Sequence, residues 1–463
     1  MRDWERATWQ TGQTEPEVIR RVGQQVALRA LRLTRPGEAI LIAAGKGHNG
    51  DDARAAAVHL ADRRVQVLDL RTPALPQLDH ALSAHPTLLI DGLLGLGLKG
   101  PLGAEWVAVV RRINQSAVRV LAVDVPSGLH ADTGEPMPEA IRATVTLTVG
   151  APKAGLLLAP AWPFVGRLEI TGEIGLAPAP TPGELAWTTP EDFRGFPPRR
   201  EAATHKGTFG HLGILAGSLG YHGAAVLAAR GAQRARPGLI TVLTTQNAYQ
   251  PIAAQCQSVM VRPWTPEERL SDNYSALVIG PGLAGSDVPA DLQASFRRLW
   301  REARIPILLD ASGLGLLGPE RAPKDAVRIL TPHPGEAGLL LKASPLQIQA
   351  SRLPSLRALS QRLGNPWVVL KGHQTLVGRQ EGPVFVNSSG GPHLAQGGSG
   401  DLLAGYLGGL LAQSALQTDP LLAIRYAVWQ HGAAADQLEV RRPNWIVEEL
   451  AEELGLAPAT AGA

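Results

Sequence analysis

Cysteine is almost absent from this chain, with Cys256 the only one among 463 residues. A single thiol excludes an intrachain disulfide and a zinc site built from cysteines. Long hydrophobic runs are also missing, because glycine and proline interrupt every apolar stretch before it reaches the roughly 20 residues of a membrane helix. The first residues, Met1–Arg6, are too charged for a secretory signal. We therefore expect a soluble, cytoplasmic protein without a membrane partner.

An excess of one charge is lacking too. The 44 Lys and Arg residues against 41 Asp and Glu give a net charge of only +3, which does not mark a nucleic-acid-binding surface. Glycine and proline number 51 and 37, below the level of a low-complexity chain. Hydrophobic residues make up 44%, enough for large cores. A length of 463 residues exceeds one domain, so two or three globular domains are expected.

No Walker-type Gly-Lys-Ser/Thr stretch occurs, but another glycine-rich turn does. Residues Gly397–Asp401 precede an apolar pattern, starting at Leu402, that predicts a helix. Backbone N–H groups at such a turn, together with the helix dipole, suit a phosphate. An aspartate beside a phosphate site repels its ligand, so Asp401 requires a chemical reason, and a general base for an attacking hydroxyl supplies one. The alternative is a capping aspartate after a flexible loop.

The first half of the chain repeats a strand–loop–helix pattern. Strands are predicted at 39–44, 65–70, 87–91, 118–123 and 144–149, and helices at 17–33 and 53–60, with 45–52 as a glycine-rich loop. This order is typical of βαβ units in a parallel sheet. Because ligands bind beyond the carboxyl ends of such strands, the loops after the first strands should converge on one crevice.

Polar residues follow these strands. Asn49, Asp91 and Ser127 offer hard oxygen ligands, which select Mg, Ca or an alkali ion. Asp124 and Lys99 are the ionisable groups best placed for proton transfer. Each of these residues, taken singly, is also explained as a helix cap.

A proline-rich break at 177–183, continued from Trp187 to Glu201, predicts a linker and a domain boundary near Pro182. The second half shows the same alternation, with a helix at 224–234 and strands at 211–216, 239–243, 276–279, 305–309, 328–330 and 367–370. The sequence thus predicts an α/β protein with two doubly wound domains.

Three loops of the first half occur together in a recognisable order: Gly45–Asp52, Asp91–Gly100 and Asp124–Leu129. They resemble the YjeF N-terminal domain, a Rossmann-like αβα domain with NAD(P)H-hydrate epimerase activity. The resemblance implies a potassium ion held by Asn49, Asp91 and Ser127. It implies substrate contacts from His48, Asn49, Gly50, Asp51, Asp52, Gly95, Leu96, Gly97, Leu98, Lys99, Gly100, Pro101 and Asp124.

The match has departures. Asp51 and Ala53 stand where the family commonly has glycine, His48 replaces an asparagine, and Arg20 replaces an acidic residue. An extra carboxylate near a diphosphate weakens binding unless it faces away or meets a cation.

Five motifs of the second half also occur in a recognisable order, with Asp310 among them: His205–Gly207, Gly280–Leu283, Thr331–Glu336, Lys371–Gly372 and Gly397–Asp401. Together they resemble the YjeF C-terminal domain, a ribokinase-like αβα domain with NAD(P)H-hydrate dehydratase activity. The resemblance implies hydrate contacts from Ala224, Gly282, His333 and Asp401. It implies adenine-nucleotide contacts from Lys371, Gly372, His373, Gln374, Thr375 and Gly400.

Together the two resemblances imply a bifunctional repair enzyme with domains at 1–181 and 182–458. The substrates implied are the hydrates NADHX and NADPHX, with ADP as co-substrate, Mg²⁺ on its phosphates and self-association into a homo-oligomer. An alternative is a hydroxymethylpyrimidine-kinase-like small-molecule kinase with a non-catalytic N-terminal binding module.

Overall fold

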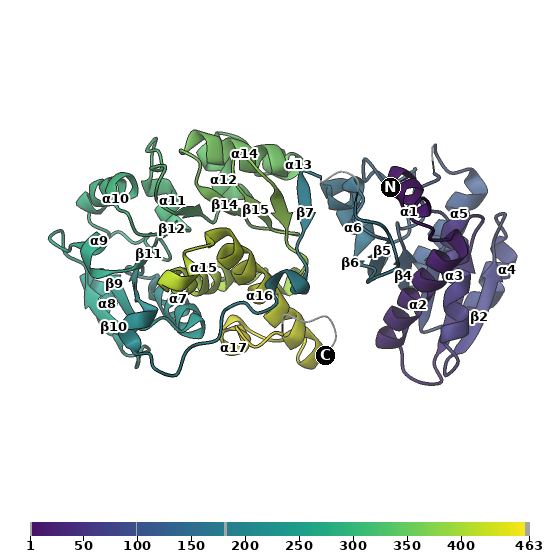
Figure 1. Cartoon of the computed structure of the whole chain (residues 1–463), viewed down its shortest axis with the longest axis horizontal. Coiled ribbons are helices and arrows are strands. Elements are labelled where there is room, and N and C mark those ends of the chain that lie inside the picture. The colour runs from purple at the N-terminus through teal and green to yellow at the C-terminus, as the bar shows by residue number, and fades with distance from the viewer. Residues whose placement is uncertain (1, 99, 180–182, 459–463) are drawn as a thin grey trace. The chain divides into compact units, whose positions relative to one another are not determined.

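The computed structural model describes residues 2–98, 100–179 and 183–458. The chain divides into two compact units, residues 1–182 and 183–463. In Figure 1 the first unit runs from purple to blue and the second from teal to yellow.

The first unit is built on six parallel strands in the order β2-β1-β3-β4-β5-β6. Their bounds are β1 (Ala39–Ala44), β2 (Arg64–Asp69), β3 (Leu88–Gly92), β4 (Arg119–Val123), β5 (Val145–Thr148) and β6 (Arg167–Ile170). The helices are α1 (Arg2–Trp9), α2 (Glu15–Leu33), α3 (His48–Ala56), α4 (Leu75–Leu82), α5 (Ala104–Gln115) and α6 (Trp162–Val165), with short 3₁₀ turns at Ala57–His59, Ala154–Leu157 and Ala159–Ala161.

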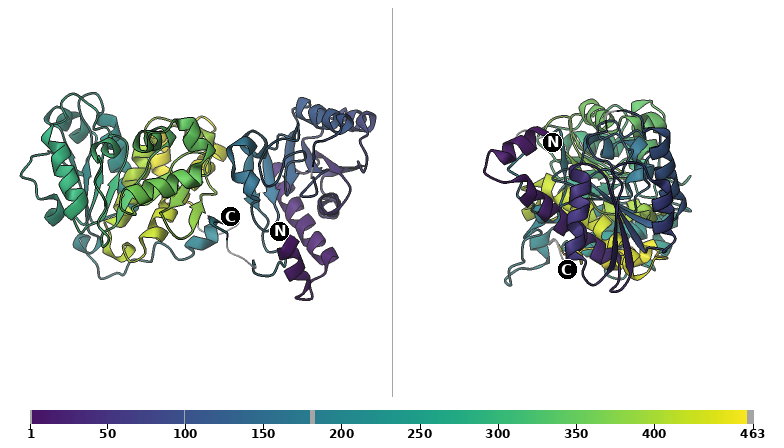
Figure 2. Two further views of the ribbon diagram at one scale, coloured as in Figure 1. Left: turned by 90° about the horizontal axis from the view of Figure 1, so that it is seen from above. Right: turned by 90° about the vertical axis from the view of Figure 1, so that its right-hand side faces the viewer.

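Helices cover both faces of this sheet. Apolar residues of α2 and α3 pack on one face, and those of α4 and α5 pack on the other. The right-hand view of Figure 2 shows the purple helices on one side of the strands and a blue helix on the other. The strand order runs outward from β1 in both directions, so the switch point where ligands bind lies between the carboxyl ends of β1 and β3.

Helix α3 begins earlier than the sequence pattern predicts. The prediction of a loop through Asp52 and a helix from Ala53 is wrong, because α3 starts at His48 and ends at Ala56. Gly47 has φ 94°, a left-handed conformation that glycine adopts freely, and it turns the chain into the helix at once. The first N–H groups of α3 therefore face the switch point, as an anion site requires.

The second unit holds a ten-stranded sheet in the order β10-β9-β8-β11-β12-β13-β14-β15-β16-β7. Its strands are β7 (Leu185–Trp187), β8 (His211–Leu215), β9 (Leu239–Thr244), β10 (Met260–Pro263), β11 (Ala276–Ile279), β12 (Ile307–Leu309), β13 (Arg328–Leu330), β14 (Trp367–Leu370), β15 (Leu376–Gly378) and β16 (Val384–Val386). Strands β10 to β14 run parallel, whereas β15 is antiparallel to both β14 and β16.

Its helices are α7 (His222–Ala235), α8 (Gln246–Ala253), α9 (Leu270–Asn273), α10 (Asp291–Glu302), α11 (Ser312–Leu316), α12 (Pro334–Leu341), α13 (Pro345–Ala350), α14 (Arg352–Arg362), α15 (Ser399–Leu411), α16 (Pro420–Arg441) and α17 (Val447–Glu453). Short 3₁₀ turns lie at Pro190–Phe193, Lys206–Phe209, Pro392–Leu394 and Ser414–Leu416. Helices α7, α15, α16 and α17 share one large core with the sheet. Buried residues of α10 and α14, such as Trp300 and Leu359, lie outside that core and cover the other face. The predicted doubly wound α/β fold is confirmed in both units.

The segment from Trp187 to Glu201 is not a linker, which corrects the sequence-based expectation. Residues 185–187 form edge strand β7, which pairs in parallel with β16. Phe193 is fully buried, with its ring 5.4 Å from that of Tyr426 and 5.3 Å from that of Trp429. Burying this aromatic ring fixes a segment whose proline content suggests an extended spacer.

Within the described residues, no helix is both long and apolar enough to cross a membrane.

Candidate active sites

Three polar residues of the first unit meet at the carboxyl ends of β1, β3 and β4, with Asp91 being the penultimate residue of β3 itself. Ser127 donates hydrogen bonds from Oγ to Asp91 Oδ1 at 2.6 Å and from its backbone N–H to Asp91 Oδ2 at 2.9 Å. Asn49 Nδ2 donates to the Leu94 carbonyl at 3.0 Å, and Ser127 Oγ lies 3.1 Å from the same carbonyl. Asn49 and Ser127 both contact the Leu94 carbonyl, and Ser127 also contacts Asp91. The three side chains therefore form one cluster.

This cluster offers the ligand chemistry of a hard cation. Asn49 Oδ1 is buried and has no hydrogen-bond partner among the described residues. Asp91 is fully buried, and that burial raises the pKa of its carboxyl group although Ser127 and Leu93 donate hydrogen bonds to it. An unpartnered amide oxygen beside a buried carboxyl group is a hard-oxygen set without imidazole or thiol, the kind of ligand set that hard cations prefer. Elsewhere, too, the described residues contain no group of three or more His, Cys, Asp or Glu side chains that could hold a metal ion.

Asp124 follows β4 in a left-handed conformation, with φ 65°. Its Oδ1 accepts a hydrogen bond from Val149 N–H at 2.9 Å and pairs closely with Lys153 Nζ. The Lys153 side chain is only 6% exposed and also donates to the Val149 carbonyl at 2.9 Å. Lys99, which the sequence suggested as the partner of Asp124, lies outside the described residues.

Lys153 was therefore missed by the sequence-based selection. It follows β5, the neighbour of β4 in the sheet, so the two strand ends bring Lys153 to Asp124 across 29 residues of chain. A lysine placed shortly after a strand end was the available signal.

Asp52 of α3 is the third ionisable group here and is 8% exposed. Burial, followed by the nearby Asp124 carboxylate, raises the pKa of Asp52 to about 8. At neutral pH Asp52 is thus a neutral acid near Asp124. Two carboxyl groups whose environments differ in this way suit the acid and base roles of one reaction.

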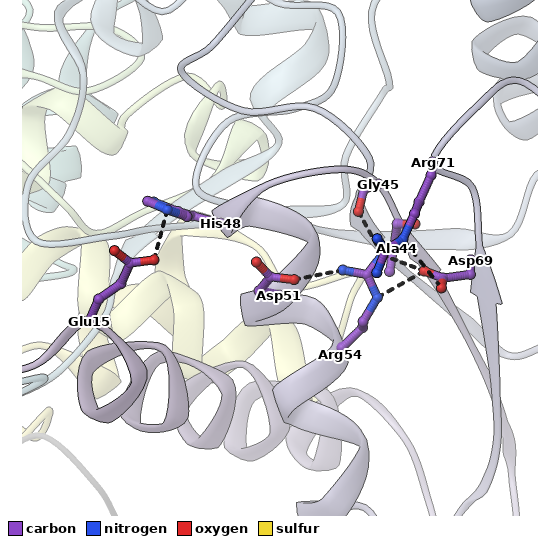
Figure 3. A network of polar contacts seen from close by, with 8 residues as sticks. All are labelled: Glu15, Ala44, Gly45, His48, Asp51, Arg54, Asp69 and Arg71. Carbon is purple, nitrogen blue, oxygen red and sulfur yellow. Dashed lines mark hydrogen bonds and ion pairs between the residues drawn. The ribbon is translucent and has the colours of Figure 1, made fainter.

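Two of the residues that depart from the family pattern, Asp51 and His48, contact side chains that can carry the opposite charge, as Figure 3 shows. Asp51 Oδ1 accepts a hydrogen bond from Arg54 Nη1 at 2.8 Å, and Arg54 Nε donates to Asp69 Oδ1 at 2.8 Å. His48 Nε2 lies 2.9 Å from Glu15 Oε1. The extra carboxylate of Asp51 therefore meets a cation, the condition under which it does not oppose a bound diphosphate.

The remaining predicted substrate residues of this unit lie near the same edge. A Cβ built on Gly95 would lie 3.1 Å from Asn49 Cβ, so the loop after β3 touches the start of α3. A Cβ added to Gly97 or Gly100 would have no atom within 4 Å, so both positions are open. Gly50 is buried at the first turn of α3, Leu96 and Leu98 are half-buried, and Pro101 is exposed.

In the second unit, acidic residues surround Lys371 at the ends of β12, β13 and β14. Lys371 Nζ donates to Asp310 Oδ1 at 2.7 Å and lies 3.9 Å from Glu336 Oε2. Thr331 Oγ1 donates to the same Asp310 oxygen at 2.6 Å. Burial alone lowers the pKa of Lys371, but the carboxylates, Asp310 first, outweigh it and raise that pKa. The carboxylates around Lys371 therefore favour its charged form.

Asp401 stands at the start of α15 beside this lysine. Gly398, with φ 93°, turns the chain into α15, and a Cβ built on Gly400 would lie 3.3 Å from Lys371 Nζ. Burial, followed by repulsion from Asp310, raises the pKa of Asp401 to about 7. A carboxylate of that pKa is suited to accept a proton at neutral pH.

Helix α16 contacts the first residue of α15 through His431. His431 Nε2 lies 3.3 Å from Ser399 Oγ, and both side chains are buried. Burial lowers the pKa of His431 to about 4, so the imidazole is neutral. This contact fixes the turn without adding charge to it.

His333 joins the same cluster through Glu336. Its ring Nδ1 accepts a hydrogen bond from Gly335 N–H at 3.0 Å, and Nε2 lies 3.5 Å from Glu336 Oε1. The imidazole is 56% exposed and so is open to a ligand.

The other predicted residues of this unit fall into two groups on either side of the cluster. A Cβ on Gly282 would lie 2.9 Å from Ala224 Cβ, so these two are in contact. Residues 371–375 form the turn between β14 and β15, where Thr375 Oγ1 donates to the Gly372 carbonyl at 3.1 Å. Both polar atoms of the Gln374 side chain are buried without a partner among the described residues, and burial lowers the pKa of His373 in the same turn.

Comparison with known proteins bears on both units. Residues 212–454 match the family model described as NAD(P)H-hydrate dehydratase, and residues 69–155 match that of the YjeF-related protein N-terminus. The bifunctional NAD(P)H-hydrate repair enzyme of Gloeobacter violaceus is 36% identical over 461 residues, covering 90% of this chain and 87% of that protein. The chain belongs to the family of bifunctional NAD(P)H-hydrate repair enzymes. A second member, from Coxiella burnetii, is 33% identical and covers 94% of this chain and 93% of its own.

Two solved structures are similar to the second unit of this chain. The ADP/ATP-dependent NAD(P)H-hydrate dehydratase of Bacillus subtilis, co-crystallised with ATP and Mg²⁺, is 31% identical, with a TM-score of 0.51, covering 58% of this chain and 96% of that one. A ribokinase-like superfamily protein from Enterococcus faecalis, 24% identical over 60% of this chain and 97% of its own, has a TM-score of 0.52 and supports the fold. The predicted membership of the repair-enzyme family, with epimerase and dehydratase domains, is confirmed.

Proposed function

We propose that residues 1–181 interconvert the R and S hydrates of NADH and NADPH, and that residues 182–458 dehydrate the S form with ADP, giving AMP and phosphate. The observation that carries the dehydratase half is Asp401, whose pKa is about 7, at the start of α15 next to Lys371. Family membership supports the reaction, and the cluster supports these residues as its site.

Dehydration begins with proton transfer to Asp401. The hydrate carries a hydroxyl group on the ring carbon next to the ring nitrogen, and hydroxide is a poor leaving group. Asp401 takes the hydroxyl proton while the oxygen attacks the terminal phosphorus of the nucleotide, and AMP leaves. The ring nitrogen then expels phosphate, and loss of a proton from the neighbouring carbon restores the dihydronicotinamide.

The charge on the transferring phosphoryl group is met by several donors. The backbone N–H groups of Gly398 and Gly400 and the ammonium of Lys371 would face it, whereas the Ser399 N–H already donates to the Gln396 carbonyl at 3.3 Å. Residues 371–375 would hold the nucleotide. Glu336 and Asp310 would help to hold a Mg²⁺ ion, which would neutralise phosphate charge. His333, Ala224 and Gly282 would contact the hydrate.

Epimerisation uses the carboxyl groups of the first unit. Asp124, held by Lys153, takes the hydroxyl proton as the bond between the ring nitrogen and the hydroxyl-bearing carbon breaks. Asp52 gives its proton to that nitrogen. The resulting aldehyde rotates and the ring closes on its other face, with both protons returned.

Asn49, Asp91 and Ser127 would hold a potassium ion, with the Leu94 carbonyl as a further oxygen. The ion supplies positive charge near the dinucleotide phosphates. His48–Asp52 and the loop 95–101 would contact the dinucleotide around it.

The proposal also includes self-association of the chain and a cytoplasmic location. Neither nucleic acid nor membrane is a partner in it. Sedimentation equilibrium of the purified chain tests the homo-oligomer.

The test uses the full chain with separated R and S hydrates, ADP, Mg²⁺ and K⁺. Wild type should consume both hydrates, Asp401→Asn neither, and Asp124→Ala only the S form beyond the spontaneous rate. Equal consumption of R and S by Asp124→Ala would remove the epimerase assignment. Accumulation of a stable phosphorylated product would instead identify a small-molecule kinase.

A further inference from the structure

A cavity in the second unit lies outside the residues assigned so far. It has a volume of about 270 Å³ and sits at the carboxyl ends of β8, β9 and β10, on the left of the unit in Figure 1. Leu215, Thr245 and Trp264 line it, together with Leu283, which directly follows Gly282. The cavity therefore opens next to the Gly282–Ala224 contact.

The lining has the chemistry of a site for a neutral aromatic ring. Trp264 is half-buried and offers an indole face. Asn247 also lines the cavity, and its side chain hydrogen-bonds to the carboxylate of Asp287. None of the described residues that line the cavity is Lys, Arg or His, so a phosphate would find no cation there.

Asp287 fixes the shape of this cavity by joining three loops. Its Oδ2 accepts a hydrogen bond from Thr245 Oγ1 at 2.6 Å, and its Oδ1 accepts one from Leu219 N–H at 2.9 Å. Burial pulls the pKa of Asp287 upward, but these hydrogen bonds outweigh burial and lower it, so the carboxylate stays ionised. The cavity is thus a built feature of the loops after β8, β9 and β11.

The position of the cavity along the carboxyl ends of the strands matches the expected position of the adenine half of the hydrate, which is the phosphoryl acceptor. The nucleotide turn 371–375 follows β14, Asp310 follows β12, and the cavity lies at β9, three strands beyond β12 in the order β12-β11-β8-β9. At about 4.8 Å per strand the separation is about 14 Å. A dinucleotide crosses several strand ends of an α/β sheet in this way.

We propose that this cavity binds the adenine ring of the hydrated dinucleotide, with Trp264 stacking on the base. The proposal rests on the proposed function, because it places the non-reacting half of the same substrate. The phosphoryl donor and the adenine of the acceptor then lie on opposite sides of Asp401.

The experiment compares two substrates in the full chain. One is S-NADHX, and the other is the hydrate of reduced nicotinamide mononucleotide, which keeps the reacting ring but lacks the adenylyl half. Loss of base stacking in Trp264→Ala should raise KM for S-NADHX by about 5- to 150-fold. KM for the truncated hydrate, KM for ADP and kcat should stay at the wild-type values.

Trp367→Ala is the matched control, since Trp367 is half-buried at the amino end of β14, whereas the cavity lies at the carboxyl ends of β8, β9 and β10. Melting temperatures of all variants show whether each is folded. Equal KM increases for both hydrates in Trp264→Ala, or no increase for either, would overturn the proposal. Failure of the proposed function is seen separately, as absence of S-NADHX turnover by the wild type.

Discussion

Replacing Asp401 by asparagine should abolish dehydration without removing the nucleotide site. Asparagine keeps the size of the side chain but cannot take the hydroxyl proton. A general base contributes about 10²- to 10⁴-fold to a rate, so kcat for S-NADHX should fall by about that factor. ADP binding should persist, because Lys371 and the backbone N–H groups of the Gly398 turn are unchanged.

The pH profile of the wild type tests the same group. Burial raises the pKa of Asp401 to about 7, and only the ionised form accepts a proton. Log kcat/KM should therefore fall with a slope of about one below pH 7 and level off above it. The Glu336 carboxylate contributes to the raised pKa, so Glu336→Gln should move the midpoint to lower pH.

The assay follows dihydronicotinamide absorbance with S-NADHX and Mg·ADP, and calorimetry measures ADP binding. Asp419→Asn is the control, because Asp419 caps α16 through Leu422 N–H at 3.0 Å and asparagine caps equally well. Turnover by Asp401→Asn within a few-fold of wild type would refute the general-base role. A Glu336→Gln midpoint at or above the wild-type value would refute the electrostatic account.

Three further predictions concern other groups. Lys153→Met removes the cation that holds Asp124, so R-to-S conversion followed by chromatography should fall at least about tenfold while S-hydrate dehydration is unchanged; an unaltered conversion rate would count against the pair. Ser127→Ala removes a cation ligand and should raise the K⁺ concentration for half-maximal epimerisation about 10- to 100-fold, with dehydration again unchanged. Arg328 is buried and donates hydrogen bonds to carbonyl groups that include Trp300 O at 2.9 Å, so Arg328→Met should cost at least about 3 kcal/mol in urea unfolding of the second unit, whereas exposed Arg298→Met should not.

The strands and the glycine-rich turns of this protein could be predicted from the sequence because their signals are local. Strands β11 and β13 lie at the predicted residues, since a short apolar run bounded by a glycine or proline loop needs no distant partner. The start of α3 was misplaced because five polar or glycine residues hide the first turn of a helix. The conformation of Gly47, and not the polarity of the residues after it, sets that start.

Some residues of the candidate sites could likewise be predicted from local patterns, whereas others could not. Asp91 and Asp401 are identifiable because each follows a recognisable local pattern, a strand end or a glycine turn. The pairing of Lys153 with Asp124 depends on β4 and β5 being neighbours in the sheet, which no residue near either side chain encodes. Arg54, which compensates the charge of Asp51, also pairs with Asp69 and so joins helix α3 to the end of β2.

By itself the sequence determined the order of elements, the glycine-rich turns and the chemical types of residue at the strand ends, because these depend on neighbours within a few positions. Only the tertiary structure decided which of those residues meet, how deeply Asp52 and Asp401 are buried, and where a cavity remains at β9. Burial and charge proximity set pKa values and ligand space, and both depend on strand order, which brings distant segments of the chain together.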